Sequence, residues 1–173
     1  MRAARRAGAP VPVRVCPPRP GFVHPAGPAD VTRVLAYFGP AATYGLRAVE
    51  LRQRPAAGTG PAVAALRVPG IVLLFEQPAP PWLLAGRPTD AATTRLERAG
   101  ARVTVGRTGT RVDWPDGTLR DFMLFDGLMH ELGHHLIQQA ARKPRTRAMR
   151  TADHERSADA YARRARDAWA ARW

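Results

Sequence analysis

The chain has 173 residues, of which 45% are hydrophobic and 24% are charged, and its formal net charge is +13. These values are typical of one folded domain with its own core, and the longest apolar run, residues 71–75, is far too short to span a bilayer. The single cysteine, Cys16, excludes an internal disulfide and a cysteine-based zinc site. We therefore expect a cytoplasmic protein without a membrane span.

The positive charge comes almost entirely from arginine, because Lys143 is the sole lysine among 27 basic residues. A charge of this size attracts nucleic acid without sequence preference. The same composition, with abundant alanine, glycine and proline, is also typical of a coding bias. Non-specific nucleic-acid binding through a basic surface is therefore one expectation, and a charge without functional meaning is the other.

Residues 1–28 are rich in proline and arginine and show no clear periodicity, which predicts a flexible arm. The segment lacks the apolar stretch of a secretory signal. Residues 29–173 are expected to form the folded domain. Within it, Asp30 is placed to cap a helix that runs to about Phe38 and ends at Gly39-Pro40.

A run of short strands is predicted next. Residues 46–54 alternate apolar and charged side chains, which predicts a strand with one solvated face. Residues 62–75 predict a strand pair or one bent strand with its break at Pro69-Gly70, and residues 70–76 are apolar enough for burial on both faces. The remaining elements of this region are strands at residues 82–85, 102–105 and 110–114, and a helix from Thr89 or Asp90 to about Ala99.

Two helices are predicted at the end of the chain. The first spans residues 118–141, with apolar side chains at three- and four-residue spacing, and the second runs from Thr151 or Ala152 to the end. A basic connector at residues 143–150 joins them. One helix, a run of strands and two final helices predict an α+β fold.

The first of these helices contains the sequence His130-Glu131-Leu-Gly-His134. Positions i and i+4 of an α-helix lie on one face, so both imidazoles can converge on one cation. Zinc accepts imidazole nitrogen readily. Glu131 lies about 100° round the helix from His130, beside the predicted site, which suits a general base acting on water.

A zinc site of this kind needs a third protein ligand, and Glu155 on the last helix is the candidate. Asp159 lies four residues further on the same face, where it can accept a hydrogen bond from a ligand histidine. Two alternatives stay open: both carboxylates lie on a solvated face paired with arginines, or His154 replaces Glu155. His135 faces about 100° away from His134 and is expected to hydrogen-bond elsewhere or face solvent.

His-Glu-Leu-Gly-His, followed by Glu-x-x-Ala-Asp-x-x-Ala at residues 155–162, resembles the gluzincin branch of the zincin metallopeptidases, in particular compact ImmA/IrrE-like and minigluzincin-type members. The resemblance covers residues 118–165. It implies a zincin-like fold with an N-terminal helix, a small twisted mixed β-sheet, an active-site helix and a C-terminal glutamate helix. The roles it implies are Zn²⁺ ligation by His130, His134 and Glu155, general-base catalysis by Glu131, and a hydrogen bond from His130 to Asp159.

We therefore expect a zinc-dependent endopeptidase that acts on a protein or peptide substrate. Residues 110–114 are our candidate for the strand edge that holds the substrate, and Tyr44, Arg156 and Tyr161 are candidates for stabilising the oxyanion. The alternatives are a binding protein on a zincin scaffold with little turnover, and a DNA-associated regulatory protein.

Overall fold

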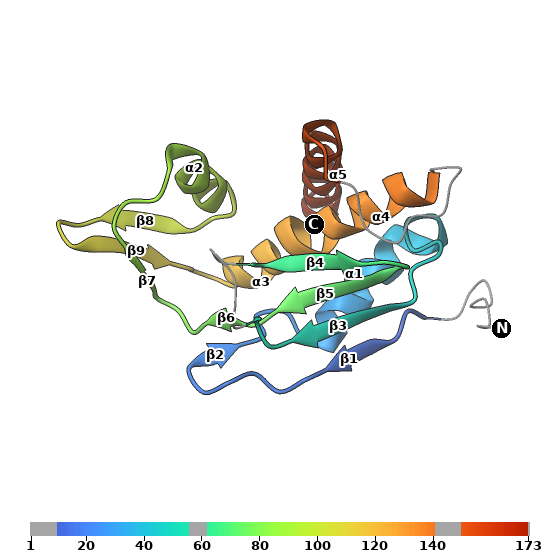
Figure 1. The fold of residues 1–173 in the computed structure, drawn as a ribbon, viewed down its shortest axis with the longest axis horizontal. Helices are drawn as coiled ribbons and strands as arrows, with labels where there is room; N and C mark the ends of the chain where they lie inside the picture. The colour runs from blue at the N-terminus through green and yellow to red at the C-terminus, as the bar shows by residue number, and fades with distance from the viewer. Residues whose placement is uncertain (1–9, 56–61, 141–149, 173) are drawn as a thin grey trace.

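The computed structural model describes residues 10–55, 62–140 and 150–172. Its largest sheet has four strands in the order β1 (Val13–Val15), β3 (Ala48–Arg52), β5 (Ile71–Phe75) and β4 (Ala64–Arg67). β1 and β5 run parallel to β3, and β4 runs antiparallel to β5. The sheet is therefore mixed, and β4 is the edge strand beside the long helix that carries the histidines (Figure 1).

β3 lies inside this sheet, and its successive side chains point to opposite faces. Val49 packs into the hydrophobic core. Glu50 points to the other face, where we expected solvent, and this prediction is wrong because the residue is only 5% exposed. Its carboxylate is covered by ion pairs with Arg14, Arg52 and Arg67.

Residues 10–28 belong to the fold, which corrects the predicted flexible arm over residues 1–28. β1 pairs with β3, and β2 (Phe22–Val23) pairs with β6 (Gln77–Pro78). The buried carboxylate of Glu76 accepts a hydrogen bond of 2.7 Å from the backbone N–H of Arg19. The prolines of this segment conceal its strands from a periodicity argument, although proline is tolerated at sheet edges. Residues 1–9 lie outside the described residues.

The first helix, α1 (Pro28–Ala42), is longer than predicted and contains a kink. Gly39 has φ 73° and ψ −171°, and Pro40 follows it, so the expected end of the helix is a break within it. The N-cap is Gly27 rather than Asp30. The Asp30 carboxylate accepts a hydrogen bond of 3.0 Å from the Gly27 N–H.

A smaller unit contains the middle of the chain and projects from one end of the molecule (Figure 1). Its strands lie in the order β7 (Trp82–Ala85), β9 (Gly109–Asp113) and β8 (Arg102–Val105), all antiparallel to their neighbours. α2 (Asp90–Arg98) belongs to the same unit, and the Thr89 side chain caps it by accepting the Ala92 N–H. The predictions of these strands and of this helix are confirmed.

The long helix predicted over residues 118–141 is also present. It consists of α3 (Thr118–Phe122), a π-helical segment η1 (Met123–Met129) and α4 (His130–Ala140), with helical backbone angles at both junctions. The π-helical segment was not predicted, because its apolar spacing resembles that of an α-helix. Such segments are frequent at functional sites, and this one ends directly before His130.

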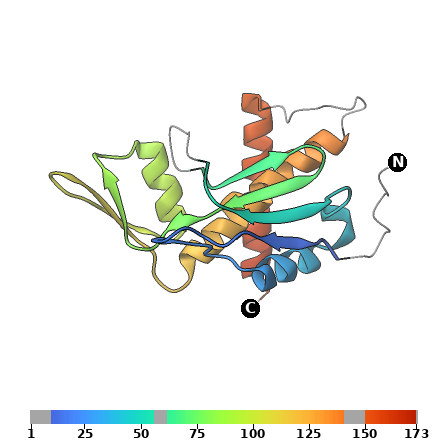
Figure 2. The same ribbon diagram turned by 60° about the horizontal axis from the view of Figure 1, so that its bottom comes forward.

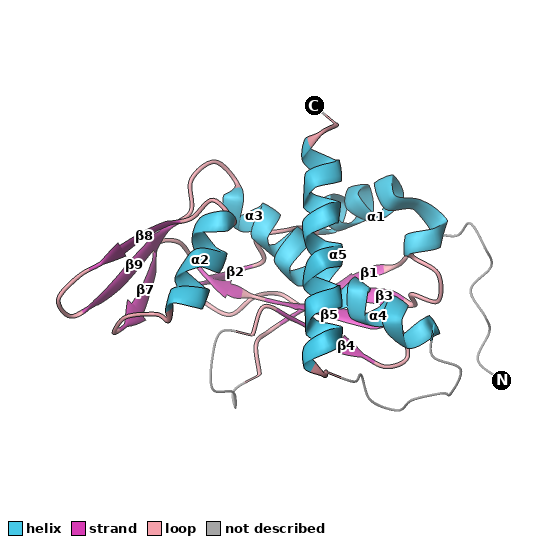
Figure 3. Cartoon of the chain, turned by 90° about the horizontal axis from the view of Figure 1, so that it is seen from above, coloured by secondary structure: helices cyan, strands magenta, loops and turns pink. Residues whose placement is uncertain are grey.

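The last helix, α5 (Ala152–Ala170), crosses the long helix, as Figures 2 and 3 show from two directions. Thr151 caps it by accepting the backbone N–H of His154. Its buried side chains are small: Ala158, Ala162 and Ala165. α5 therefore packs closely on η1 and α4.

The described architecture is mixed α+β, with helices packed against sheets. Val49, Val72 and Leu74 of the main sheet share one hydrophobic core with Leu128 and Leu132 of the long helix. Among the described residues, no helix has both the length and the apolar character needed to cross a bilayer.

Candidate metal centre

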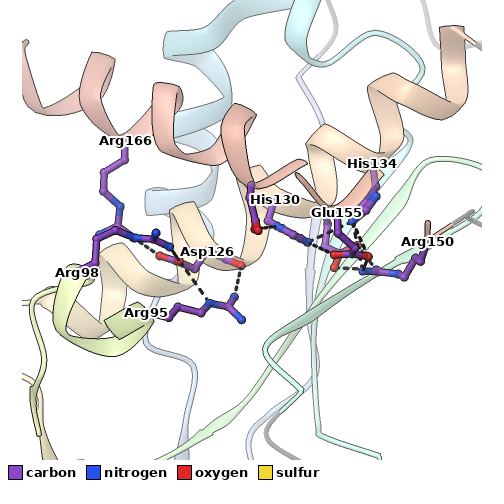
Figure 4. Close-up of polar contacts among 10 residues, drawn as sticks. Arg95, Arg98, Asp126, His130, His134, Arg150, Glu155 and Arg166 are labelled. Atoms are coloured by element: carbon purple, nitrogen blue, oxygen red, sulfur yellow. Dashed lines mark hydrogen bonds and ion pairs between the residues drawn. The ribbon is translucent and has the colours of Figure 1, made fainter. Parts of the chain in front are cut away.

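Three potential metal ligands converge where α4 crosses α5 (Figure 4). His130 Nε2 lies 3.2 Å from His134 Nε2. The Glu155 carboxylate faces both rings, with Oε2 at 3.4 Å from His130 Nε2 and Oε1 at 3.4 Å from His134 Nε2. One ligand atom from each residue lies within 4.8 Å of the others. The structure thus brings together the three residues that the sequence analysis selected as metal ligands.

Asp159 supports this arrangement from behind His130. Its Oδ1 lies 2.9 Å from His130 Nδ1. A proton on Nδ1 is held by this carboxylate, so the lone pair of Nε2 is directed toward Glu155 and His134. The position of Asp159 is the one that the sequence analysis expected.

His134 is buried, and its surroundings favour the neutral ring. Burial lowers its pKa, the positive charge of Arg150 lowers it further, and the opposing effects of Glu131 and Glu155 are smaller. The neutral imidazole is the form that binds a metal ion. Among the described residues, His134 Nδ1 has no hydrogen-bond partner.

Glu155 supplies a negative charge to the same point. Burial tends to raise its pKa, but the electrostatic effects of the neighbouring His134, Arg150 and His130 outweigh this and lower it. The carboxylate is therefore ionised at neutral pH. Two imidazole nitrogens and one carboxylate oxygen form a donor set that zinc accepts with an open fourth position, so the residues present fit this ion.

Arg150 is a residue of this site that sequence reasoning missed. Its Nη2 donates hydrogen bonds to both oxygens of Glu131, at 2.9 and 2.6 Å. Its Nη1 lies 3.3 Å from Glu155 Oε1 and 3.4 Å from His134 Nε2. Burial tends to lower the pKa of Arg150, but its contacts with Glu131 and Glu155 raise it. The sequence offered no signal beyond its place in a basic connector, most of which lies outside the described residues.

The other candidate residues lie elsewhere. His135 Nε2 is 2.9 Å from the carbonyl oxygen of Tyr44, so this ring hydrogen-bonds away from the metal centre, as expected. His154 is not one of the three converging residues. The cleft described below is lined by none of the three candidates for stabilising the oxyanion, Tyr44, Arg156 and Tyr161. Arg156 pairs with Asp153 instead.

A cleft with a volume of about 590 Å³ opens beside the metal centre. Its walls come from the edge of β4, the outer face of α2, the long helix and α5. The lining residues include Ala64, Arg95, Arg98, Asp126, His130 and Glu131.

The strand that borders this cleft differs from our expectation for residues 110–114. β9, which covers most of them, is paired on both sides, with β7 and with β8, and offers no edge. The edge strand at the cleft is β4, which pairs only with β5 in the described sheet. The order of strands in a sheet is set by contacts distant in sequence, which is why the local pattern misled here.

Comparisons of the chain with protein-family models, with curated proteins and with solved structures gave no match.

Proposed function

We propose that this protein is a zinc-dependent endopeptidase of the gluzincin type. The observation that carries the proposal is the convergence of His130, His134 and Glu155 from two crossing helices. The neighbouring groups support it, since Asp159 orients His130 and Glu131 lines the adjoining cleft. Such a set of groups is the minimum that a metal-assisted hydrolase needs.

In this mechanism, His130, His134 and Glu155 hold zinc, which when bound lowers the pKa of a water molecule and polarises a carbonyl group. Glu131 accepts the proton of the attacking water and passes it to the departing amine. While it pairs with Arg150, the Glu131 side chain is only 4% exposed. Asp159 holds the proton on His130 Nδ1 throughout.

The edge of β4 is a suitable binding site for the substrate backbone. An extended peptide can add to an unpaired strand edge through backbone hydrogen bonds, and Ala64 of β4 lines the cleft that contains His130 and Glu131. We propose that the substrate backbone lies along this edge, with its cleaved bond at the metal centre.

The bidentate ion pair between Arg150 and Glu131 favours a second candidate function. While one guanidinium group donates hydrogen bonds to both carboxylate oxygens, it occupies the place from which a water molecule would approach Glu131. A metal-binding scaffold with little turnover would keep this pair in place. In the endopeptidase, the pair opens when substrate enters, and Arg150 becomes a donor near the developing oxyanion.

The test starts from the zinc content of purified wild-type protein, with His134→Ala as the variant that lacks a ligand and His154→Ala as the matched control. We expect one zinc ion per chain in wild type and in the control, and loss of the ion in His134→Ala. Cleavage of a denatured protein such as casein is then compared with that by Glu131→Gln. Loss of cleavage with retained zinc supports the peptidase, whereas zinc binding without cleavage by wild type supports the scaffold. Absence of zinc from wild type refutes both.

A further inference from the structure

One wall of the cleft carries more positive charge than its surroundings. Ala91, Thr94, Arg95 and Arg98 all line the cleft, and their spacing places them on one face of α2. The opposite side of the helix is anchored by the buried Leu96. α2 therefore presents two arginines to the same cavity that contains the metal centre.

These arginines gather around Asp126 of η1, as Figure 4 shows. Asp126 Oδ2 forms a close ion pair with Arg166 of α5. Its Oδ1 lies 3.6 Å from Arg95 Nε and 3.8 Å from Arg98 Nη2, beyond normal hydrogen-bond length. Arg95 Nη2 donates instead to the backbone oxygen of Asp126, at 3.1 Å. One carboxylate thus faces three guanidinium groups, and the cluster keeps two positive charges in excess.

Arg98 is the least engaged of these groups. Within the described part of the chain its guanidinium group donates no hydrogen bond, and its side chain is 47% exposed. Arg95 is 45% exposed and also lies over the Phe122 ring, with its guanidinium carbon 5.5 Å from the ring centre. Two partly solvated guanidinium groups held side by side match the geometry of an incoming carboxylate, which arginine binds through two parallel hydrogen bonds.

The charge at the metal centre is different. Among the described residues that line this end of the cleft, Glu131, Glu155 and Asp159 are opposed by Arg150 alone, which leaves two negative charges that a zinc ion would balance. With zinc bound, the end of the cleft at the metal centre (its metal end) would therefore be neutral. The end formed by α2 (its α2 end) is positive. A peptide along the β4 edge would meet both ends.

We propose that Arg95 and Arg98 form a subsite for an acidic side chain, aspartate or glutamate, of the peptide substrate. This inference rests on the proposed function and names the class of substrate for the same cleft. A polyphosphate chain suits the cavity less well, because the metal end of the cleft, neutral when loaded, offers no excess positive charge to successive phosphates.

The experiment measures peptide binding rather than turnover. The full chain carrying Glu131→Gln is titrated, by fluorescence anisotropy, into labelled ten-residue peptides that differ only by glutamate or glutamine at one scanned position. We expect about tenfold tighter binding of the glutamate peptide at the best position, which is about 1.4 kcal/mol. The preference should weaken as the salt concentration rises.

Variants of α2 test whether Arg98 causes the preference for the glutamate peptide. Arg98→Gln should abolish it, and Arg98→Glu should reverse it in favour of a lysine peptide. Arg107→Gln is the matched control, because this exposed arginine lies in the β8–β9 hairpin of the same unit and does not line the cleft. Arg98 makes few contacts, so its variants are expected to fold, and their circular dichroism and melting temperature are compared with those of the parent.

Three outcomes would overturn the subsite. The first is equal binding of both peptides, and the second is a preference that survives both Arg98 variants. The third is displacement of either peptide by a single-stranded oligonucleotide with no effect of the glutamate, which would assign the arginines to nucleic acid. Each of these outcomes can occur while zinc content and cleavage behave as proposed. The subsite proposal can therefore be refuted while the proposed peptidase function stands. Conversely, a glutamate preference in a protein that binds no zinc would refute the peptidase and keep the subsite.

Discussion

Gly133 of α4 lies directly against the backbone of Ala158 of α5: a Cβ atom at position 133 would stand 2.9 Å from the Ala158 α-carbon and 3.3 Å from its Cβ. Real Cβ atoms essentially never approach other heavy atoms as closely as 2.9 Å. The contact sits between His130 and His134 on one helix and beside Glu155 on the other. The absence of a side chain at Gly133 therefore sets how near the glutamate helix comes to the histidines.

Gly133→Ala should consequently weaken zinc binding, although alanine favours a helix more than glycine does. We expect the crowding to cost about 1–3 kcal/mol and to move Glu155 away from the imidazoles. Gly127→Ala is the control, since its added Cβ would meet the Val63 side chain at 3.2 Å rather than backbone. Zinc dissociation constants from competition with a chelator check this, and equal affinities in both variants would contradict the expectation.

Asp159→Ala should lower zinc affinity by about 10- to 100-fold, because His130 would lose the carboxylate that orients its ring. Asp159→Asn should lose less, since the amide oxygen can still accept the proton of Nδ1. The same chelator competition measures both variants. An alanine variant that binds zinc like wild type would show that the 2.9 Å contact has no role in metal binding.

Arg150→Ala should destabilise the metal-free protein by about 1–3 kcal/mol, because it leaves the buried Glu131 carboxylate without its partner. The arginine side chain is 40% exposed, so solvent screening favours the lower part of this range. Urea unfolding in the presence of a chelator measures the effect. In the Glu131→Gln background the same substitution should cost much less, and additive effects would argue against a direct interaction.

Removal of zinc should lower the melting temperature of the wild-type protein. A ligand that binds only the folded state, present at a hundred times its dissociation constant, stabilises by about 2.7 kcal/mol. Calorimetric scans with zinc and with a chelator give the difference. His134→Ala should show no difference between the two conditions, and a stabilisation by zinc that persists in this variant would place the ion elsewhere.

The acid sensitivity of the fold should depend on Glu76. Burial tends to raise the pKa of this carboxyl group, but hydrogen bonds and charge from Arg19 and the Arg54 backbone N–H lower it. Because the folded-state pKa is the lower one, the stabilisation is complete above the unfolded-state value of about 4.3 and is lost as the pH falls through the folded-state value.

Glu76→Gln should therefore cost about 1–3 kcal/mol at pH 7, and its difference from wild type should shrink below about pH 4. Urea unfolding at a series of pH values measures this difference. Asp90→Asn serves as the control, because the Asp90 side chain is 99% exposed and should contribute little at any pH. A difference that stays constant down to pH 3 would exclude Glu76 as a source of the acid sensitivity.

Local periodicity was enough to predict much of this protein. The spacing of His130 and His134 placed both on one face of a helix, and the same four-residue spacing placed Glu155 and Asp159 on one face of the next. The structure brings all four residues together. The two final helices, α2 and the strands at residues 64–75 and 82–113 were also recognisable, because their side chains repeat with the period of the backbone.

Tertiary structure decided the contacts between segments, which no local repeat encodes. The pairing of β1 with β3, the choice of β4 rather than β9 as the edge at the cleft, and the approach of Arg150 to Glu131 all join residues that are distant in sequence. So does the gathering of Arg95, Arg98 and Arg166 around Asp126. The sequence by itself determined which side chains share a helix or strand face, since backbone geometry repeats every few residues. Only packing decided which faces meet, because burial of apolar surface has no direction of its own and the whole chain must satisfy it at once.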